Sequence, residues 1–276
     1  MDSQQLILPQ GITFSQIKDS QGNVLHNGSG RIGDCLVFSG LPEMWAQQKD
    51  ERLVDIDKAW FFDYNPHVIR GVKVERTIPL IALADRSTHH TYLRNLPNFL
   101  SLPDKYCAYF GLECTLRHPR LYKYEDIERK PNKVIITTQG ANQGLMMNET
   151  ADRILSDEII ETIKFNYRNF EIVQIGLPTD KDAGVIDKRG IPIWDAVKEI
   201  AESMYYIGPN CGIMWIASAY PHINKKVVLT QYNKNALEYL IPMHVDIHHH
   251  QWLDHSCQWY NKFNEDVGIT SSFRKI

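Results

Sequence analysis

The chain has 276 residues, 43% of them hydrophobic and 23% charged, which is enough for two domains of ordinary size or one large domain. Its formal net charge of −3 argues against a generally basic surface for nucleic acid. No stretch approaches the ~20 apolar residues of a membrane span, and the N-terminus lacks the apolar segment of a signal peptide.

The cysteines indicate the compartment. Their number is odd, and no pair has the CxxC spacing of a metal or redox motif. We therefore expect a cytoplasmic protein with free thiols. The five positions are Cys35, Cys107, Cys114, Cys211 and Cys257.

The N-terminal half predicts an irregular or hairpin segment over residues 1–30, followed by a helix and strands. Two short β-like runs flank turn residues at 19–23, and the apolar spacing from Leu36 to Trp45 fits one helix face. Apolar runs at 58–64 and 77–83 predict strands. Residues 87–124 are rich in aromatics, Pro and His and show no clear period.

The C-terminal half alternates strands with helices, which predicts βαβ units and a parallel sheet. The charged stretch 125–132 contains Pro131 and is the best linker candidate. The predicted fold is therefore α/β, with two domains facing a cleft. The expected strands are 134–138, 172–175, 205–207 and 227–229, and the expected helices are 154–170, 193–204 and 212–219.

Polar and glycine residues follow each of the first three of these strands. Ligands of parallel sheets bind at the carboxyl ends of the strands, and hydroxyls and backbone N–H groups suit a diphosphate. The alternative is that these loops only turn the chain. The candidates are Thr137, Thr138, Gln139, Gly176, Asp180, Gly208, Asn210, Cys211 and Gly212.

A glycine-rich segment in the first half carries a second group of candidates. Arg31, Gly33 and Asp34 precede the helix that contains Trp45. Asp34 is either a helix cap, which spacing alone favours, or a general base towards an acceptor hydroxyl. Arg31 is either a positive charge beside phosphates or a surface ion pair.

Two motifs resemble the heptosyltransferases of glycosyltransferase family 9. Gly-Arg-Ile-Gly-Asp at 30–34 leads into an apolar helix with Ser39 and Leu41-Pro42. Residues 207–219 read Ile-Gly-Pro-Asn-Cys-Gly-Ile-Met-x-x-Ala-x-Ala. The resemblance implies a GT-B fold, in which two Rossmann-like domains face a cleft and the C-terminal one binds most of the nucleotide-sugar.

The resemblance also implies a division of the chain and roles for its residues. Residues 1–128 would form the acceptor-side domain, 129–245 the donor domain, and 246–276 a helical segment packing back on the first domain. Asp34 matches the proposed general base, and Thr137 with Thr138 matches a hydroxyl pair near the donor diphosphate. Residues 210–212 match the loop at the donor sugar and phosphate. Residues 176–180 would lie near the nucleoside, with Met204 or Ile193 near its base.

The chain departs from the family pattern at several positions. Residues 139–143 lack the family's lysine, Asn210 replaces an acidic residue, and Trp215 stands where the family often has His. The N-terminal half is also short for a family member. These departures leave the donor sugar open, heptose especially.

The function implied is an inverting transfer from a nucleotide-sugar, without metal or cofactor, to an acceptor hydroxyl. Asp34 would act as base, and the threonine hydroxyls and helix N-termini would stabilise the leaving diphosphate. A non-catalytic nucleotide-sugar-binding protein and a nucleotide-sugar epimerase are the alternatives.

The acceptor, a glycan, a protein or a modified nucleobase in DNA, would bind the segment 86–123. Arg86 and His89 in that segment either contact it or lie on a solvated loop. A cluster of imidazoles near the C-terminus resembles metal ligands, but adjacent histidines cannot all face one ion. We therefore expect a polar helix there instead of a metal site. The cluster comprises His244, His248, His249, His250, His255 and Cys257.

Overall fold

The computed structural model divides the chain into two compact units, Met1–Lys123 and Tyr124–Ile276. The division falls a few residues before the expected boundary after residue 128 and at the edge of the predicted linker. The structure describes residues 11–13, 17–18, 24–26, 36, 39–55, 59–70, 77–79, 104, 107–108, 110–116, 118–140, 154–209, 211–229 and 257–261.

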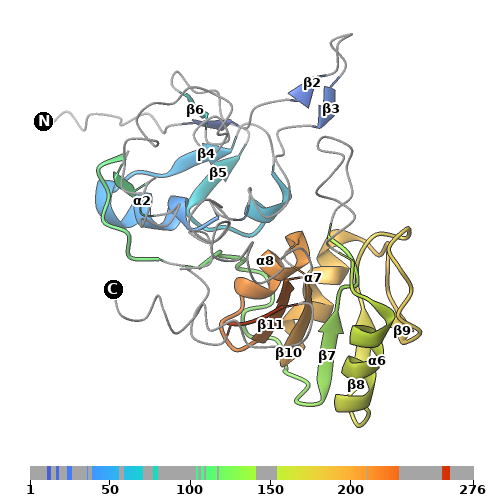
Figure 1. The fold of residues 1–276 in the computed structure, drawn as a ribbon. Coiled ribbons are helices and arrows are strands. Elements are labelled where there is room, and N and C mark those ends of the chain that lie inside the picture. Colours follow the sequence, from blue (N-terminus) through green and yellow to red (C-terminus); the bar gives the residue numbers. More distant parts are fainter. Residues whose placement is uncertain are drawn as a thin grey trace, which may run out of the picture. The chain divides into compact units, whose positions relative to one another are not determined.

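The first unit contains a four-stranded parallel sheet with the strand order β5-β4-β1-β6 (Figure 1). The chain order β1, β4, β5 runs outward on one side of β1, and β6 pairs with its other side. Helix α2 (Leu41–Lys49) lies between β1 and β4 in the chain, as its apolar spacing predicts. The strands are β1 (Gly11–Thr13), β4 (Leu53–Asp55), β5 (Val68–Arg70) and β6 (Thr77–Pro79).

A hairpin of β2 (Ile17–Lys18) and β3 (Val24–His26) follows β1, which is one of the two alternatives that the sequence leaves open for residues 1–30. The predicted strand at 58–64 is instead a 3₁₀-helix, η1 (Trp60–Phe62). A strand would place the consecutive Phe61 and Phe62 on opposite faces, whereas both are buried here.

The second unit contains a six-stranded sheet with the order β12-β11-β10-β7-β8-β9, and every pair is parallel. Chain order reverses between β7 and β10, which gives the doubly wound order 3-2-1-4-5-6 of dinucleotide-binding folds. The strands are β7 (Lys133–Ile136), β8 (Glu171–Gln174), β9 (Ile186–Asp187), β10 (Tyr205–Pro209), β11 (Asn224–Leu229) and β12 (Cys257–Asn261).

Helices cover both faces of this sheet. Helix α6 (Asp157–Asn166) begins at Ser156, whose hydroxyl accepts the Ile159 N–H at 3.3 Å. Its apolar face packs on alternate residues of β7, Val134 and Ile136. Helix α7 (Ile193–Ala201) packs beside α8 (Gly212–Ser218), and right-handed crossovers to β10 and β11, on the other side of β7, place both on the opposite face.

The segment 246–276 differs from its prediction. The residues of it that the structure describes, Cys257–Asn261, form strand β12 and pair in parallel with β11, instead of forming a helix. Aromatic residues such as Trp259 and Tyr260 favour strands, and pairing removes the free edge of β11. Within the described part of the chain, no helix has the length and apolarity needed to traverse a bilayer.

Candidate functional site

The point where strand order reverses brings two of the predicted loops together. Thr137 directly follows β7, and its N–H donates to the carbonyl of Ile207 in β10 at 3.1 Å. β7 and β10 lie side by side in the middle of the sheet (Figure 1). Open α/β sheets bind ligands at such a reversal, outside the carboxyl ends of the strands.

The Thr137 side chain is buried at this point. It is 1% exposed, and its hydroxyl has no hydrogen-bond partner among the described residues. Gly208 faces it closely, because a Cβ added there would lie 2.7 Å from the Thr137 carbonyl oxygen and 3.2 Å from its Cβ. A buried hydroxyl without a partner costs about 1–3 kcal/mol, so a group that bonds to it is favoured here.

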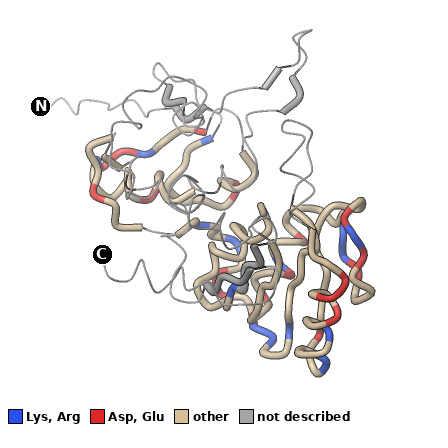
Figure 2. Tube along the Cα trace, in the orientation of Figure 1, with Lys and Arg blue, Asp and Glu red and all other residues tan. Residues whose placement is uncertain are grey.

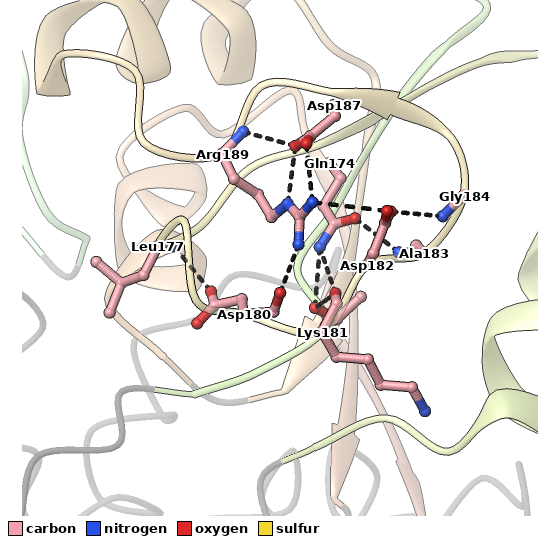
Figure 3. A network of polar contacts seen from close by, with 10 residues as sticks. Gln174, Leu177, Asp180, Lys181, Asp182, Ala183, Gly184, Asp187 and Arg189 are labelled. Carbon is pink, nitrogen blue, oxygen red and sulfur yellow. Dashed lines mark hydrogen bonds and ion pairs between the residues drawn. The ribbon is translucent and has the colours of Figure 1, made fainter.

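The neighbouring Thr138 differs from Thr137. Its hydroxyl donates to the Lys181 carbonyl at 2.6 Å and accepts from Gln174 Nε2 at 3.0 Å. Gln174 Nε2 also donates to the Lys181 carbonyl at 2.7 Å, and Gln174 Oε1 accepts the Ala183 N–H at 2.8 Å (Figure 3). These bonds join the end of β7 to the loop that follows β8.

Asp180 folds back over the start of the same loop. Its Oδ2 accepts the Leu177 N–H at 2.9 Å, and the side chain lies against Gly176, where any Cβ would collide with this oxygen. Burial raises the pKa of the Asp180 carboxyl, although the Leu177 N–H and the Arg189 charge act in the opposite direction. The loop thus holds a carboxylate at the carboxyl edge of β8.

Arg189 joins the loop after β8 to strand β9 through hydrogen bonds. Its guanidinium donates to both carboxylate oxygens of Asp187 at 2.8 Å and also to the Asp180 carbonyl (Figure 3). The hydrogen bonds from Arg189 lower the pKa of Asp187 to about 2. Arg189 and Gln174 are not among the site residues predicted from the sequence. A glutamine inside the apolar run Ile172–Ile175 was the available signal for the latter.

Cys211 ends the loop that follows β10 and directly precedes helix α8. Its thiol is buried and lies 3.4 Å from the Tyr206 hydroxyl. Burial raises the pKa of the Cys211 thiol, although the Tyr206 hydroxyl and the N–H groups of Ile213 and Met214 act in the opposite direction. A thiol held in its neutral form is a packing group and no nucleophile.

The predicted site residues therefore divide into two groups. Thr137, Thr138, Gly208, Cys211 and Gly212 lie at the reversal point between β7 and β10. Gln139 forms an isolated bridge with Ile154, and Gly176 and Asp180 follow the neighbouring β8. Arg31, Gly33, Asp34, Arg86, His89 and Asn210 lie outside the described residues.

The described parts of the predicted acceptor segment run along helix α2, from its C-terminal end near Glu113 to its first turn near Arg120. The Tyr122 ring lies 5.9 Å from that of His67, which directly precedes β5. Gln48, near the end of α2, exchanges two hydrogen bonds of 2.7 and 2.8 Å with the backbone of Glu113. At the other end of α2, the Tyr122 hydroxyl donates to Glu43 Oε2 at 2.7 Å in the first turn of the helix, so the segment spans the length of α2.

Neither the thiols nor the acidic residues form a metal centre in the part of the chain that the structure describes. Cys107, Cys114 and Cys211 carry free thiols, as expected. The imidazole cluster from His244 to Cys257 lies outside the described side chains, so its predicted lack of metal stays a prediction.

Comparison with known proteins identifies the fold. No family model matches the sequence, and no curated protein matches it closely. TibC, an iron-containing dodecameric glycosyltransferase from enterotoxigenic E. coli, matches with a TM-score of 0.55 at 15% identity, over 80% of this chain and 58% of its own. A family 9 glycosyl transferase from Veillonella parvula gives 0.55 at 9% identity, over 80% of each chain. The E. coli ADP-heptose lipopolysaccharide heptosyltransferase II gives 0.50 at 12% identity, over 97% of each.

The chain has the fold of these glycosyltransferases. The predicted α/β class with parallel sheets is confirmed, and so is the resemblance at the level of fold. The chain spans 58% of the length of TibC, so activity does not follow from that similarity.

Proposed function

We propose that the chain is a glycosyltransferase that moves a sugar from a nucleoside diphosphate sugar to an acceptor hydroxyl. The observation that carries this proposal is the buried Thr137 hydroxyl, which lacks a partner among the described residues where strand order reverses. Ligands of doubly wound sheets bind at this reversal. The fold shared with solved glycosyltransferases and the motif at 207–219 support a sugar nucleotide as the ligand.

In the proposed reaction the acceptor oxygen attacks the anomeric carbon, the bond from that carbon to the diphosphate breaks, and the configuration inverts. Asp34 takes the proton of the acceptor hydroxyl. Thr137 donates a hydrogen bond to the leaving diphosphate, and the backbone N–H groups around Gly212 add to this stabilisation. Arg31 supplies positive charge, and no metal takes part.

The loop after β8 would hold the nucleoside. Asp180 is 7% exposed, and the loop that carries it is fixed by Gln174 and Arg189. A carboxylate that is held in one position suits a ribose hydroxyl, which donates hydrogen bonds. TibC has been solved with ADP-D-β-D-heptose, and we propose a nucleotide-sugar ligand for this chain as well.

A thermal-shift panel of ADP, GDP, UDP and their sugars tests the proposal on the full chain. A selective ligand at a hundredfold excess over its Kd should stabilise the protein by about 2.7 kcal/mol. If none of the panel shifts the transition, the nucleotide-sugar assignment is wrong.

Substitution of Asp34 then separates an enzyme from a binding protein. Asp34→Asn should retain donor affinity and reduce turnover about 10²- to 10⁴-fold, whereas the exposed Asp50→Asn serves as the matched control. Binding without turnover in the wild type would indicate a non-catalytic binder. Isomerised donor without acceptor would indicate an epimerase.

A further inference from the structure

We propose that Thr137 and Thr138 have different functions: Thr138 and Gln174 form a positioning lock for the loop 176–183, and only Thr137 is left to contact a ligand. The lock is defined by Thr138, Gln174, the Lys181 carbonyl and the Ala183 N–H. Its effect on a bound nucleotide rests on the proposed function, but its effect on the loop does not.

The Thr138 hydroxyl has already used its only proton. A hydroxyl has one proton to donate, and that of Thr138 is given to the Lys181 carbonyl at 2.6 Å. One of its lone pairs accepts from Gln174 Nε2 at 3.0 Å. Thr138 is fully buried, so these two bonds cannot be replaced by water. Its hydroxyl therefore has no proton left for a phosphate oxygen.

The Gln174 side chain binds two backbone groups of the loop. It is fully buried, and its amide uses both ends: Nε2 reaches Thr138 and the Lys181 carbonyl, and Oε1 accepts the Ala183 N–H at 2.8 Å. Figure 3 shows this amide pointing into the loop between Lys181 and Ala183. Two backbone groups of the loop are thereby tied to one side chain of β8 and, through Thr138, to β7.

The position of Asp180 depends on the lock. Asp180 directly precedes Lys181, and its carboxylate accepts the Leu177 N–H at the start of the loop. If the lock opens, the loop loses its hydrogen bonds at Lys181 and Ala183 and keeps the bond from Arg189 to the Asp180 carbonyl. Asp180 is then held less tightly. Thr138 and Gln174 act through the loop and do not touch the ligand.

Thr137 supplies the contrast. It has the same side chain and is nearly as buried as Thr138, yet its hydroxyl has no partner among the described residues. The two adjacent threonines therefore form a matched pair, because the same change to valine removes two bonds at one position and none at the other.

Hydrogen–deuterium exchange of the ligand-free full chain tests the lock. Thr138→Val and Gln174→Met should each speed amide exchange at 176–183 about 2- to 10-fold, corresponding to one lost hydrogen bond or slightly more. Thr137→Val should leave exchange there unchanged, and Thr138→Ser, which keeps the hydroxyl, should restore it. Unchanged exchange in Thr138→Val and Gln174→Met would overturn the lock.

Calorimetric titration with ADP, GDP and UDP tests the consequence. For a nucleotide that binds the wild type, Thr137→Val should weaken binding without loosening the loop. Thr138→Val should weaken binding together with faster exchange, and Thr138→Ser should recover both. Weaker binding in Thr138→Ser, or in Thr138→Val with the loop unchanged, would assign Thr138 to the ligand instead. If no nucleotide binds the wild type, the proposed function fails, and the exchange experiment still decides the lock.

Discussion

Gly176 lies so close to the Asp180 carboxylate that it leaves no room for a side chain. The contact arises because Asp180 turns back to accept the Leu177 N–H. The sequence showed a glycine and an aspartate after a strand, which is enough to predict a loop at the ligand edge. It did not show that they touch each other, since that depends on the turn between them.

Gly176→Ala should therefore lower the free energy of unfolding by about 1–3 kcal/mol, the range for overpacking a filled site. Gly40→Ala is the matched control, because its new Cβ would lie 3.6 Å from the nearest atom, in ordinary contact. Urea unfolding measures both variants. In Gly176→Ala/Asp180→Ala the carboxylate is gone, so the loss should be smaller than the sum of the single changes. An additive result would contradict the proposed clash.

The elements of the second unit are joined by a buried ion network as well as by apolar packing. Lys133, the fully buried first residue of β7, reaches Glu199 at 2.6 Å and Glu202 at 3.0 Å, on or directly after α7. Lys188 and Lys130 pair with the same two carboxylates. Figure 2 shows that acidic and basic residues are both distributed over the described part of the second unit.

Lys133→Met should reduce the free energy of unfolding by about 1–3 kcal/mol near neutral pH, because each glutamate keeps at least one other lysine. Burial raises the pKa values of Glu199 and Glu202, but the lysine hydrogen bonds and charges outweigh it, so both lie below 4.5. Their stabilisation is thus complete above pH 4.5 and is lost as the pH falls through the folded-state pKa values.

The difference between wild type and Lys133→Met should consequently shrink below that pH, as measured by urea unfolding at a series of pH values. Lys198→Met is the control, because Lys198 is half exposed and 4.0 Å from Glu202. A difference that stays constant with pH would show that packing, and not charge, explains the loss.

The length of the apolar pattern limits which elements the sequence predicts. α6, α7 and the strands β7, β8 and β10 repeat their apolar pattern often enough to be found, to within a few residues. The strands β4 and β5 contain only two consecutive apolar residues each, which predicts no strand, whereas the equally short β6 lies in the longer apolar run 77–83. The edge strand β12 lies in a segment for which the sequence predicts a helix, because its pairing with β11 is not local and leaves no signal there.

At the scale of the whole molecule, the two units repeat one strand order. Numbered along the chain, the first sheet runs 3-2-1-4 and the second 3-2-1-4-5-6. Alternating patterns predicted the α/β class, but not these orders, because the pairing of distant strands leaves no mark in a short window of sequence. The candidate residues at the reversal point were found through motifs, and the buried Gln174 lock was not.

Residues 124–276 should fold without the first unit. The apolar core around Val134 and α6, the buried ion network and all the strand pairs of the second sheet lie within this range. We expect the fragment to unfold cooperatively in urea, with an m-value of about 1–3 kcal/mol/M. Val173→Asp, which places a charge at a fully buried position, should abolish that transition and so controls for residual structure.

The same fragment should bind any nucleoside diphosphate that the full chain binds, because Thr137, Asp180 and Gly212 all belong to it. It should not transfer sugar, since the proposed base Asp34 belongs to the first unit. Titration calorimetry and a turnover assay measure the two properties separately. A fragment that folds cooperatively but no longer binds would place essential nucleotide contacts in the first unit. Turnover by the fragment would rule out Asp34 as the base.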